Sequence, residues 1–323
     1  MGTALSTLET ALGQNKIKTH EPLAAHTSLR IGGPAEYFVA LDAVSEIVIA
    51  VKTAYQLELP VLILGGGSNI LVSEKGISGL VIKNSCRKIE LLGFKGKITN
   101  RRLNVASVQV FAESGAIMNQ LVRFTLDQGL SGLEYQLGLP GTIGGGIFMN
   151  ASYAPRSAYV GDHLASATLL SPKGEVKEVG PSYFRFSDDA SVLQITNEIL
   201  LSATFLLTPF DKDTVWQRGK EAVEHRTSSQ PKNTVGVTFR NTTISNPISS
   251  PQEKFTAEYL IEKAGLKGKR IGDAMIAQGD THFIVNCGSA KAEHVSSLLS
   301  LAKQELKRRF GVELKVYTKV FGI

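Results

Sequence analysis

The sequence predicts an α+β fold. Helical and strand-like apolar patterns follow one another along the 323 residues without the strict strand–helix alternation of a parallel α/β sheet. Hydrophobic residues make up 43% and charged residues 20%, the composition of an ordinary globular protein. Because one domain usually holds about 100–200 residues, this length indicates two or three domains.

In the first half of the chain, apolar spacing and glycine or proline breaks mark the elements. Leu5, Leu8 and Leu12 share one helical face, so we expect a helix over residues 1–20. Pro60 ends a helical pattern and precedes the apolar run Val61–Leu64, which predicts a buried strand. The other elements predicted here are a strand near 31–39, a helix at 45–57, a strand at 79–83, antiparallel strands within 89–110 and a helix at 116–128.

The second half continues with mixed elements. Pro172–Glu175 is a turn sequence, so residues 163–179 should form a hairpin. Amphipathic spacing and short apolar runs predict the remaining elements: a strand at 198–207, helices at 216–226, 257–265 and 294–310, and strands at 284–286 and 312–320.

The charge balance favours small anionic ligands. The chain has 35 basic and 29 acidic residues, a net charge of +6, yet no block of five or more like charges. Phosphates and carboxylates suit this mild excess at least as well as DNA, and we expect no nucleic-acid partner. No stretch of about 18 apolar residues occurs, so no membrane partner is expected either.

Cysteine and histidine usage indicates neither disulfides nor a metal site. Cys86 and Cys287 are far apart and form no C-x-x-C motif, and the six histidines lack metal-ligand spacing. The N-terminus shows no basic and apolar segments typical of a signal peptide. We therefore expect a cytoplasmic protein without a bound metal.

The first glycine-rich loop directly follows the Val61–Leu64 strand. Successive glycines let backbone N–H groups converge without side-chain obstruction, and serine and asparagine add donors suited to phosphate oxygens. No helix-opening G-x-G-x-x-G or G-K-[ST] motif is present. A tight structural turn is the alternative to a phosphate site. The candidate cofactor-binding residues are Gly65, Gly66, Gly67, Ser68 and Asn69.

A second glycine-rich loop spans residues 138–150 and carries almost no charge. Proline fixes one turn position, and the glycines allow close approach of a flat or anionic ligand. Two such loops in one domain favour a large buried cofactor, with a diphosphate held by backbone amides. The candidate residues are Gly138, Pro140, Gly141, Thr142, Gly144, Gly145 and Asn150.

These loops carry a resemblance to a known family. The motifs are Thr27–Ala35, Leu64–Val72, Gly129–Glu134, Gly138–Asn150, Gln230-Pro231, Phe239–Asn241, Leu260–Gly268 and Phe283–Asn286. In this order they resemble the UDP-N-acetylenolpyruvoylglucosamine reductase family, in its shorter subclass, from about Thr27 to Gly322.

The resemblance implies a domain layout and a reaction. It implies a two-lobed FAD-binding domain of the vanillyl-alcohol-oxidase/PCMH type, with lobes at 1–90 and 91–210, and a substrate-binding α+β domain at 211–323. The implied flavoprotein is a monomeric oxidoreductase that transfers hydride from NADPH through FAD to its sugar-nucleotide substrate, giving UDP-N-acetylmuramate for peptidoglycan synthesis. All three small molecules are anionic, which suits the net positive charge.

The resemblance also assigns catalytic positions. Phe184–Ser187 matches the family's Tyr-Arg-x-Ser pattern, so Arg185 should pair with the substrate carboxylate. Val237 stands where the family has its proton-donating serine, and Tyr317 where it has glutamate. Thr238 offers a hydroxyl, but in a strand its side chain points to the opposite face. Tyr317 either donates the proton itself or only packs in the pocket.

Substrate contacts are expected from Phe239, Arg240, Asn241 and Glu262, while Asp280 stands near the position of a family histidine. Losing a positioned general acid lowers rates about 10²–10⁴-fold. Two alternatives therefore stay open: a catalytically altered or inactive FAD-binding homologue, and an FAD oxidoreductase that acts on another substrate.

Overall fold

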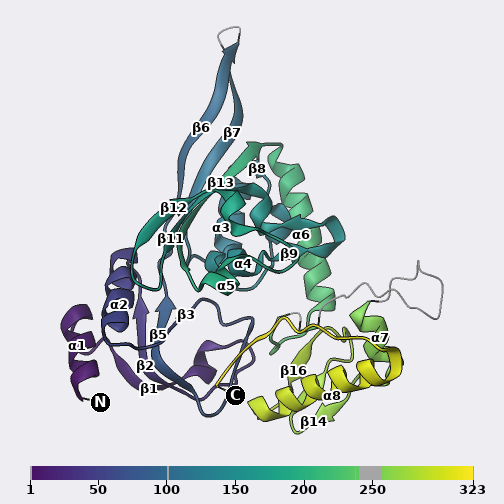
Figure 1. The fold of residues 1–323 in the computed structure, drawn as a ribbon. Helices are drawn as coiled ribbons and strands as arrows, with labels where there is room; N and C mark the ends of the chain where they lie inside the picture. The colour runs from purple at the N-terminus through teal and green to yellow at the C-terminus, as the bar shows by residue number, and fades with distance from the viewer. Residues whose placement is uncertain (1, 100–101, 237, 240–255, 323) are drawn as a thin grey trace. The chain divides into compact units, whose positions relative to one another are not determined.

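The computed structural model describes residues 2–99, 102–236, 238–239 and 256–322 (Figure 1). They belong to two compact units. Unit 1 lies within Met1–His20, Glu36–Gly66 and Ser78–Arg226, and unit 2 within Glu21–Ala35, Gly67–Ile77 and Thr227–Ile323. The chain thus passes between units five times, whereas the predicted boundaries at 90 and 210 cut it only twice. We keep the three-part division into 1–90, 91–210 and 211–323 as a proposal.

The first sheet of unit 1 has four strands in the order β1 (Lys18–Pro22), β2 (Pro34–Leu41), β5 (Ile77–Asn84) and β3 (Val61–Leu64). β3 and β5 are parallel, with Val61 opposite Leu80. Helices α1 (Gly2–Leu12) and α2 (Val44–Gln56) pack on each other beside this sheet. Their apolar faces share one buried cluster with strand residues such as Val39, Leu80 and Ile82.

The predicted N-terminal helix is too long. It ends at Leu12 because Gly13 and Asn15 adopt positive φ angles of 107° and 65°, which no helix accommodates. Residues 18–22 then form β1 instead.

The second sheet of unit 1 is antiparallel. Its order is β12 (Val176–Val179), β11 (Leu164–Leu170), β13 (Ile199–Pro209), β7 (Arg102–Glu113) and β6 (Ile89–Thr99), with β8 (Leu130–Ser131) paired to β13. This confirms the predicted antiparallel strands and hairpin. β6 and β7 extend together as a long ribbon (Figure 1).

Helices α3 (Met118–Asp127), α4 (Ile143–Met149), α5 (Leu193–Thr196) and α6 (Lys212–Ser229) accompany this sheet. Leu121, Ile147, Phe184 and Phe205 are fully buried in the cluster that joins helices to sheet. The remaining short elements are β9 (Ser152–Tyr153), β10 (Ala158–Tyr159) and 3₁₀ turns η1 (Leu23–His26), η2 (Glu134–Gln136), η3 (Ala154–Arg156), η4 (Val160–His163) and η5 (Pro181–Phe184).

Unit 2 packs two helices on a small antiparallel sheet. The sheet contains β14 (Arg270–Ile271), β15 (Ala274–Ile276) and β16 (Ile284–Asn286), and the helices are α7 (Ala257–Lys263) and α8 (Ala292–Phe310). A separate parallel pair joins β4 (Ile70–Val72) to β17 (Lys319–Phe321).

The predicted strand over 312–320 is observed only at 319–321. Val312 and Leu314 are buried in the core of unit 2, so their alternation reflects core packing, and only an isolated bridge pairs Val316 with Phe239. Within the described residues, no helix is long and apolar enough to cross a membrane.

Candidate cofactor-binding and active site

The two predicted glycine loops meet within unit 1. A Cβ built on Gly66 would lie 2.6 Å from Gly141 Cα, and one on Gly65 would lie 2.4 Å from Thr142 Oγ1. Real Cβ atoms do not approach so closely, so only glycine allows the loops this contact. Lys83 Nζ also donates to Gly65 O at 2.5 Å, and burial lowers the pKa of Lys83. The glycines at 65 and 66 therefore serve first to pack one loop on the other.

The second loop contains a short helix that the sequence interpretation did not include. Thr142 caps α4, because its Oγ1 accepts a hydrogen bond from Gly145 N at 3.4 Å. A Cβ on Gly144 would lie 3.1 Å from Ser114 O, and one on Gly146 would lie 2.7 Å from Met118 Cε. Gly144 therefore packs tightly against the Ser114 backbone, whereas a side chain at 146 would displace only the flexible end of Met118.

Gly145 differs from its two neighbours. Outside its chain neighbours and the backbone of α4, a Cβ there would meet only Thr142 Oγ1 among the described residues within 4 Å, at 3.8 Å. The space beside Gly145 is thus open to a ligand, at the start of α4.

Asn150 connects this loop to the segment of Arg185. Its backbone is left-handed, with φ of 44°. The side-chain Nδ2 donates to Ser187 O at 3.0 Å, and Oδ1 accepts from Gly161 N at 3.1 Å. Both ends of the amide are therefore bonded to protein, and Asn150 acts here as a structural clamp.

Arg185 is exposed, and the residues on either side of it are aromatic and pack against each other. Phe184 is fully buried, and Phe186 stacks on it with ring centroids 5.0 Å apart. Arg185 itself has a left-handed φ of 47°. Among the described residues, its guanidinium forms no hydrogen bond or ion pair, so it is available to an anionic group.

A buried arginine supports the turn before the second loop. Arg226 Nη1 donates to the carbonyls of Tyr135 and Leu137 at 2.8 and 2.6 Å, and its guanidinium lies 5.0 Å from the Tyr153 ring centroid. Burial lowers the pKa of Arg226 to about 10. Gly138, with φ of 87°, follows this turn, and its N–H donates to Asn119 Oδ1 at 2.6 Å. Sequence patterns give no signal for this tertiary contact.

Glu134 fixes the start of the same turn. Its carboxylate accepts from Gly132 N at 2.5 Å, Ser131 Oγ at 2.8 Å and Arg218 Nη1 at 3.2 Å. Burial disfavours the ionised form, but these hydrogen bonds outweigh it and lower the pKa of Glu134. Pro140, another predicted cofactor contact, lies exposed after this turn.

The rest of the first loop belongs to unit 2. Gly67 has φ of 65°, and a Cβ there would lie 2.0 Å from His26 O. Asn69 Nδ2 donates to Tyr317 O at 3.4 Å, while Asn69 Oδ1 is buried and has no hydrogen-bond partner among the residues that the structure describes. The carbonyl of Ser68 lies 3.3 Å from a Cβ built on Gly236. The structure thus brings Asn69 and Tyr317 together.

Thr238 lies beside Tyr317 but faces the interior of unit 2. Tyr317 N donates to Thr238 O at 3.0 Å, and the Tyr317 side chain is half-buried. The fully buried Thr238 hydroxyl donates to Val235 O and accepts from Ile284 N, both at 3.4 Å. This hydroxyl is therefore engaged by backbone groups.

The predicted substrate residues have different surroundings. Phe239 is fully buried in the core, so its ring does not face solvent. Glu262, on α7, is paired with Lys267 Nζ at 2.5 Å. Val237, Arg240 and Asn241 lie outside the described residues.

Comparisons with known proteins agree with this layout. Residues 229–321 match the C-terminal domain of UDP-N-acetylenolpyruvoylglucosamine reductase, and residues 35–180 match an FAD-binding domain. The reductase of Trichormus variabilis is 34% identical over 95% of this chain and 87% of its own. The Symbiobacterium thermophilum reductase 2 is 33% identical over 95% of this chain and 92% of its own.

Solved structures give the same result. UDP-N-acetylenolpyruvylglucosamine reductase (MurB) from Thermus caldophilus superposes with a TM-score of 0.73 at 27% identity, over 95% of this chain and 99% of its own. p-Cresol methylhydroxylase, at 10% identity and a TM-score of 0.54 over 99% of this chain and 89% of its own, shares the fold. These matches confirm the predicted α+β fold with its PCMH-type FAD-binding domain. The chain belongs to the UDP-N-acetylenolpyruvoylglucosamine reductase family and is an FAD-binding oxidoreductase.

Proposed function

We propose that this protein reduces UDP-N-acetylenolpyruvoylglucosamine to UDP-N-acetylmuramate, with NADPH as reductant and FAD as cofactor, in peptidoglycan precursor synthesis. The relatives named above carry this reductase's name and match the chain over nearly its whole length. The observation that carries the proposal is the exposed guanidinium of Arg185, which has no ion-pair partner among the described residues; the motif resemblance assigns it the role of the family's catalytic arginine.

The residues of the two loops fit FAD. We propose that Gly65–Asn69 and Gly138–Asn150 hold it, with backbone amides suited to diphosphate oxygens. Open space beside Gly145 supports this, and so does the unsatisfied Asn69 Oδ1, which could accept a hydrogen bond from a ligand hydroxyl. When bound, FAD supplies the hydride-transfer chemistry that no amino-acid side chain provides.

Arg185 would orient the substrate and stabilise charge. Its planar guanidinium can bind a carboxylate through two parallel hydrogen bonds. Charge that develops at this carboxylate during reduction would be stabilised by the fixed positive group. The anchored rings of Phe184 and Phe186 support this role, because they hold the backbone on both sides of the arginine.

Tyr317 is our candidate for the proton donor. The buried hydroxyl of Thr238 is engaged by backbone groups, which disfavours it. Tyr317 is half-buried, and its phenol carries an O–H group that can donate a proton. A Tyr317→Phe variant should then lower the rate of substrate reduction about 10²-fold or more without changing flavin content. Unchanged turnover would exclude Tyr317 as the donor.

A second candidate function is a catalytically altered family member that binds FAD without completing the reaction. The observation that favours it is the pair of departures at Val237 and Tyr317, the positions of the family's serine and glutamate. Such a protein would bind ligand but fail to oxidise NADPH or to reduce the substrate.

Anaerobic flavin absorbance separates these functions. The protein is reduced with NADPH, and UDP-N-acetylenolpyruvoylglucosamine is then added. Return of the oxidised flavin spectrum is the expected result. A flavin that stays reduced would mean that the second half-reaction is lost or needs another substrate, and absence of flavin even after FAD is supplied would refute the cofactor site. NADH in a parallel sample tests the proposed NADPH preference, and size-exclusion chromatography tests the proposed monomer.

A further inference from the structure

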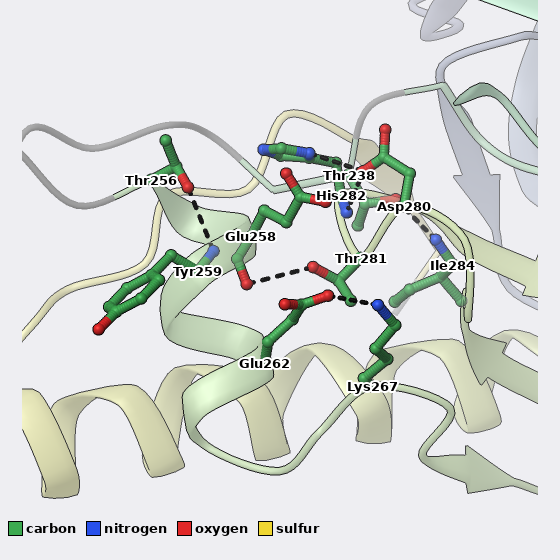
Figure 2. A network of polar contacts seen from close by, with 10 residues as sticks. All are labelled: Thr238, Thr256, Glu258, Tyr259, Glu262, Lys267, Asp280, Thr281, His282 and Ile284. Carbon is green, nitrogen blue, oxygen red and sulfur yellow. Dashed lines mark hydrogen bonds and ion pairs between the residues drawn. The ribbon is translucent and has the colours of Figure 1, made fainter. Parts of the chain in front are cut away.

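Three potential metal ligands converge in unit 2, outside the residues proposed for FAD and catalysis (Figure 2). Glu258 lies on α7, while Asp280 and His282 lie in the turn before β16. One carboxylate oxygen from each acid and one imidazole nitrogen all lie within 4.8 Å of one another. Glu258 is far along the sequence from Asp280 and His282. A motif of closely spaced metal ligands therefore does not reveal this cluster.

The turn positions its two ligands through backbone contacts. Asp280 Oδ1 accepts from His282 N at 2.9 Å and lies 2.7 Å from His282 Nδ1. His282 O in turn accepts from Thr238 N at 2.7 Å. The Asp280 and His282 side chains are 20% and 14% exposed, so solvent reaches them although most of their surface is covered.

Helix α7 is held against this turn independently of the ligands. Thr281 Oγ1 donates to the backbone carbonyl of Glu258 at 3.4 Å. Among the described residues, the Glu258 carboxylate itself makes no hydrogen bond or ion pair, and Figure 2 shows it beside the His282 ring. The neighbouring acid, Glu262, points instead to Lys267.

The ligand set has the chemistry of a transition-metal site. Zinc binds imidazole nitrogen and carboxylate oxygen at about 2.0–2.2 Å, so tetrahedral ligand atoms stand about 3.4 Å apart. Separations of at most 4.8 Å need only small side-chain adjustments to reach that arrangement. Calcium would require about 6–8 oxygen ligands, which three side chains including one imidazole do not supply. The two negative charges of the acids match one divalent cation.

We propose that Glu258, Asp280 and His282 form a binding site for one divalent transition-metal ion, with zinc the best fit, and that solvent completes its coordination. The bound ion joins α7 to the turn before β16. This site is independent of the proposed function, because its occupancy can be measured without flavin or substrate.

Metal titration of the full-length, tag-free protein after chelator treatment tests the site. Zinc is titrated against a chromophoric chelator, and cobalt serves as a spectroscopic probe whose visible absorption reports imidazole and carboxylate coordination. We expect one ion per chain. Glu258→Gln, Asp280→Asn and His282→Gln each remove a direct ligand, so each should weaken zinc affinity by at least the 10–100-fold that loss of an outer-shell partner costs.

Glu262→Gln is the matched control, since it removes a carboxylate of the same helix that lies outside the cluster. It should bind zinc as the unmodified protein does. Zinc should also raise the unfolding temperature of the unmodified protein and of Glu262→Gln, but not of the three ligand variants. Circular dichroism without metal establishes that each variant is folded. Weak zinc binding that none of the three substitutions changes would overturn the proposal, as would failure of the unmodified protein to compete with the chelator.

Discussion

Gly145 and Gly66 provide a direct test of which glycines serve a cofactor and which serve protein packing. A Gly145→Ala substitution adds a methyl group into open space, since its Cβ would meet only Thr142 Oγ1, at 3.8 Å. Alanine also improves helix propensity by about 0.5–1 kcal/mol over glycine. The apoprotein should therefore be as stable as the unmodified protein or slightly more so.

FAD binding should respond in the opposite direction. If the cofactor occupies the space beside Gly145, an added methyl group overlaps it, and overpacking costs about 1–3 kcal/mol. Since 1.4 kcal/mol corresponds to a factor of ten in affinity, the Kd for FAD should rise about 5- to 150-fold. Titration of the apoprotein with FAD, followed by quenching of flavin fluorescence, measures this change.

Gly66→Ala is the comparison, because its Cβ would lie 2.6 Å from the backbone Cα of Gly141. The backbone cannot rotate away as a side chain can, so stability should fall by about 1–3 kcal/mol. Thermal unfolding of the two apoproteins should thus separate them clearly. Unchanged FAD affinity in a stable Gly145→Ala protein would refute the placement of the cofactor beside α4.

Three further predictions concern charged side chains of unit 1. Arg185→Ala should lower turnover about 10²–10³-fold, as loss of a fixed charge-stabilising group does, and steady-state kinetics measure this. The unfolding temperature, measured by calorimetry, should stay unchanged, because the exposed guanidinium has no ion-pair partner among the described residues. Glu134→Gln should destabilise the protein by about 1–3 kcal/mol near pH 7 in urea unfolding, since a buried carboxylate with three hydrogen bonds is lost. The pKa of Glu134 is lower in the folded than in the unfolded protein, so its ionised form stabilises the fold above the unfolded pKa of about 4.5. This contribution is lost as the pH falls through the folded pKa, so the Glu134→Gln variant should lose less stability on acidification than the unmodified protein. Equal dependence of stability on acid pH in the two proteins would contradict this assignment. Arg226→Met should cost about 1–3 kcal/mol, because two buried carbonyls lose their donor; a neutral effect in urea unfolding would show that they are satisfied otherwise.

Regular elements with strong local signals were predictable from the sequence. α2 and β3 were placed within one residue of their observed bounds, because apolar periodicity and Pro60 identify them locally. α4 was not foreseen, because three glycines lower helix propensity in any local scale. The structure gives a partial reason: Gly144 lies against the Ser114 backbone, where a Cβ would be 3.1 Å from the carbonyl oxygen, and Gly146 lies against the flexible end of Met118.

The sequence indicated where the two glycine-rich loops lie, but not which contacts each of their side chains makes. The spacing of glycines identified the two loops, yet Asn150 proves to clamp the Arg185 segment with both ends of its amide. Phe239 likewise lies in the core, a position that a short motif cannot distinguish from a surface one. Contacts between distant segments, such as Arg226 with the Tyr135 and Leu137 carbonyls, leave no periodic pattern at all.

The proposed departures at Val237 and Tyr317 would affect proton transfer and not binding. The roles proposed for the glycine loops and for Arg185 rest on backbone geometry and on one fixed charge. Binding of FAD and of the substrate carboxylate can therefore persist whether or not a proton donor is present. In the proposed reaction the flavin delivers the hydride and Tyr317 the proton, so Tyr317→Phe should affect the step after flavin reduction and leave reduction by NADPH unchanged. A Tyr317→Phe protein that loses both half-reactions would instead indicate that the phenol supports the structure of the site, not proton transfer.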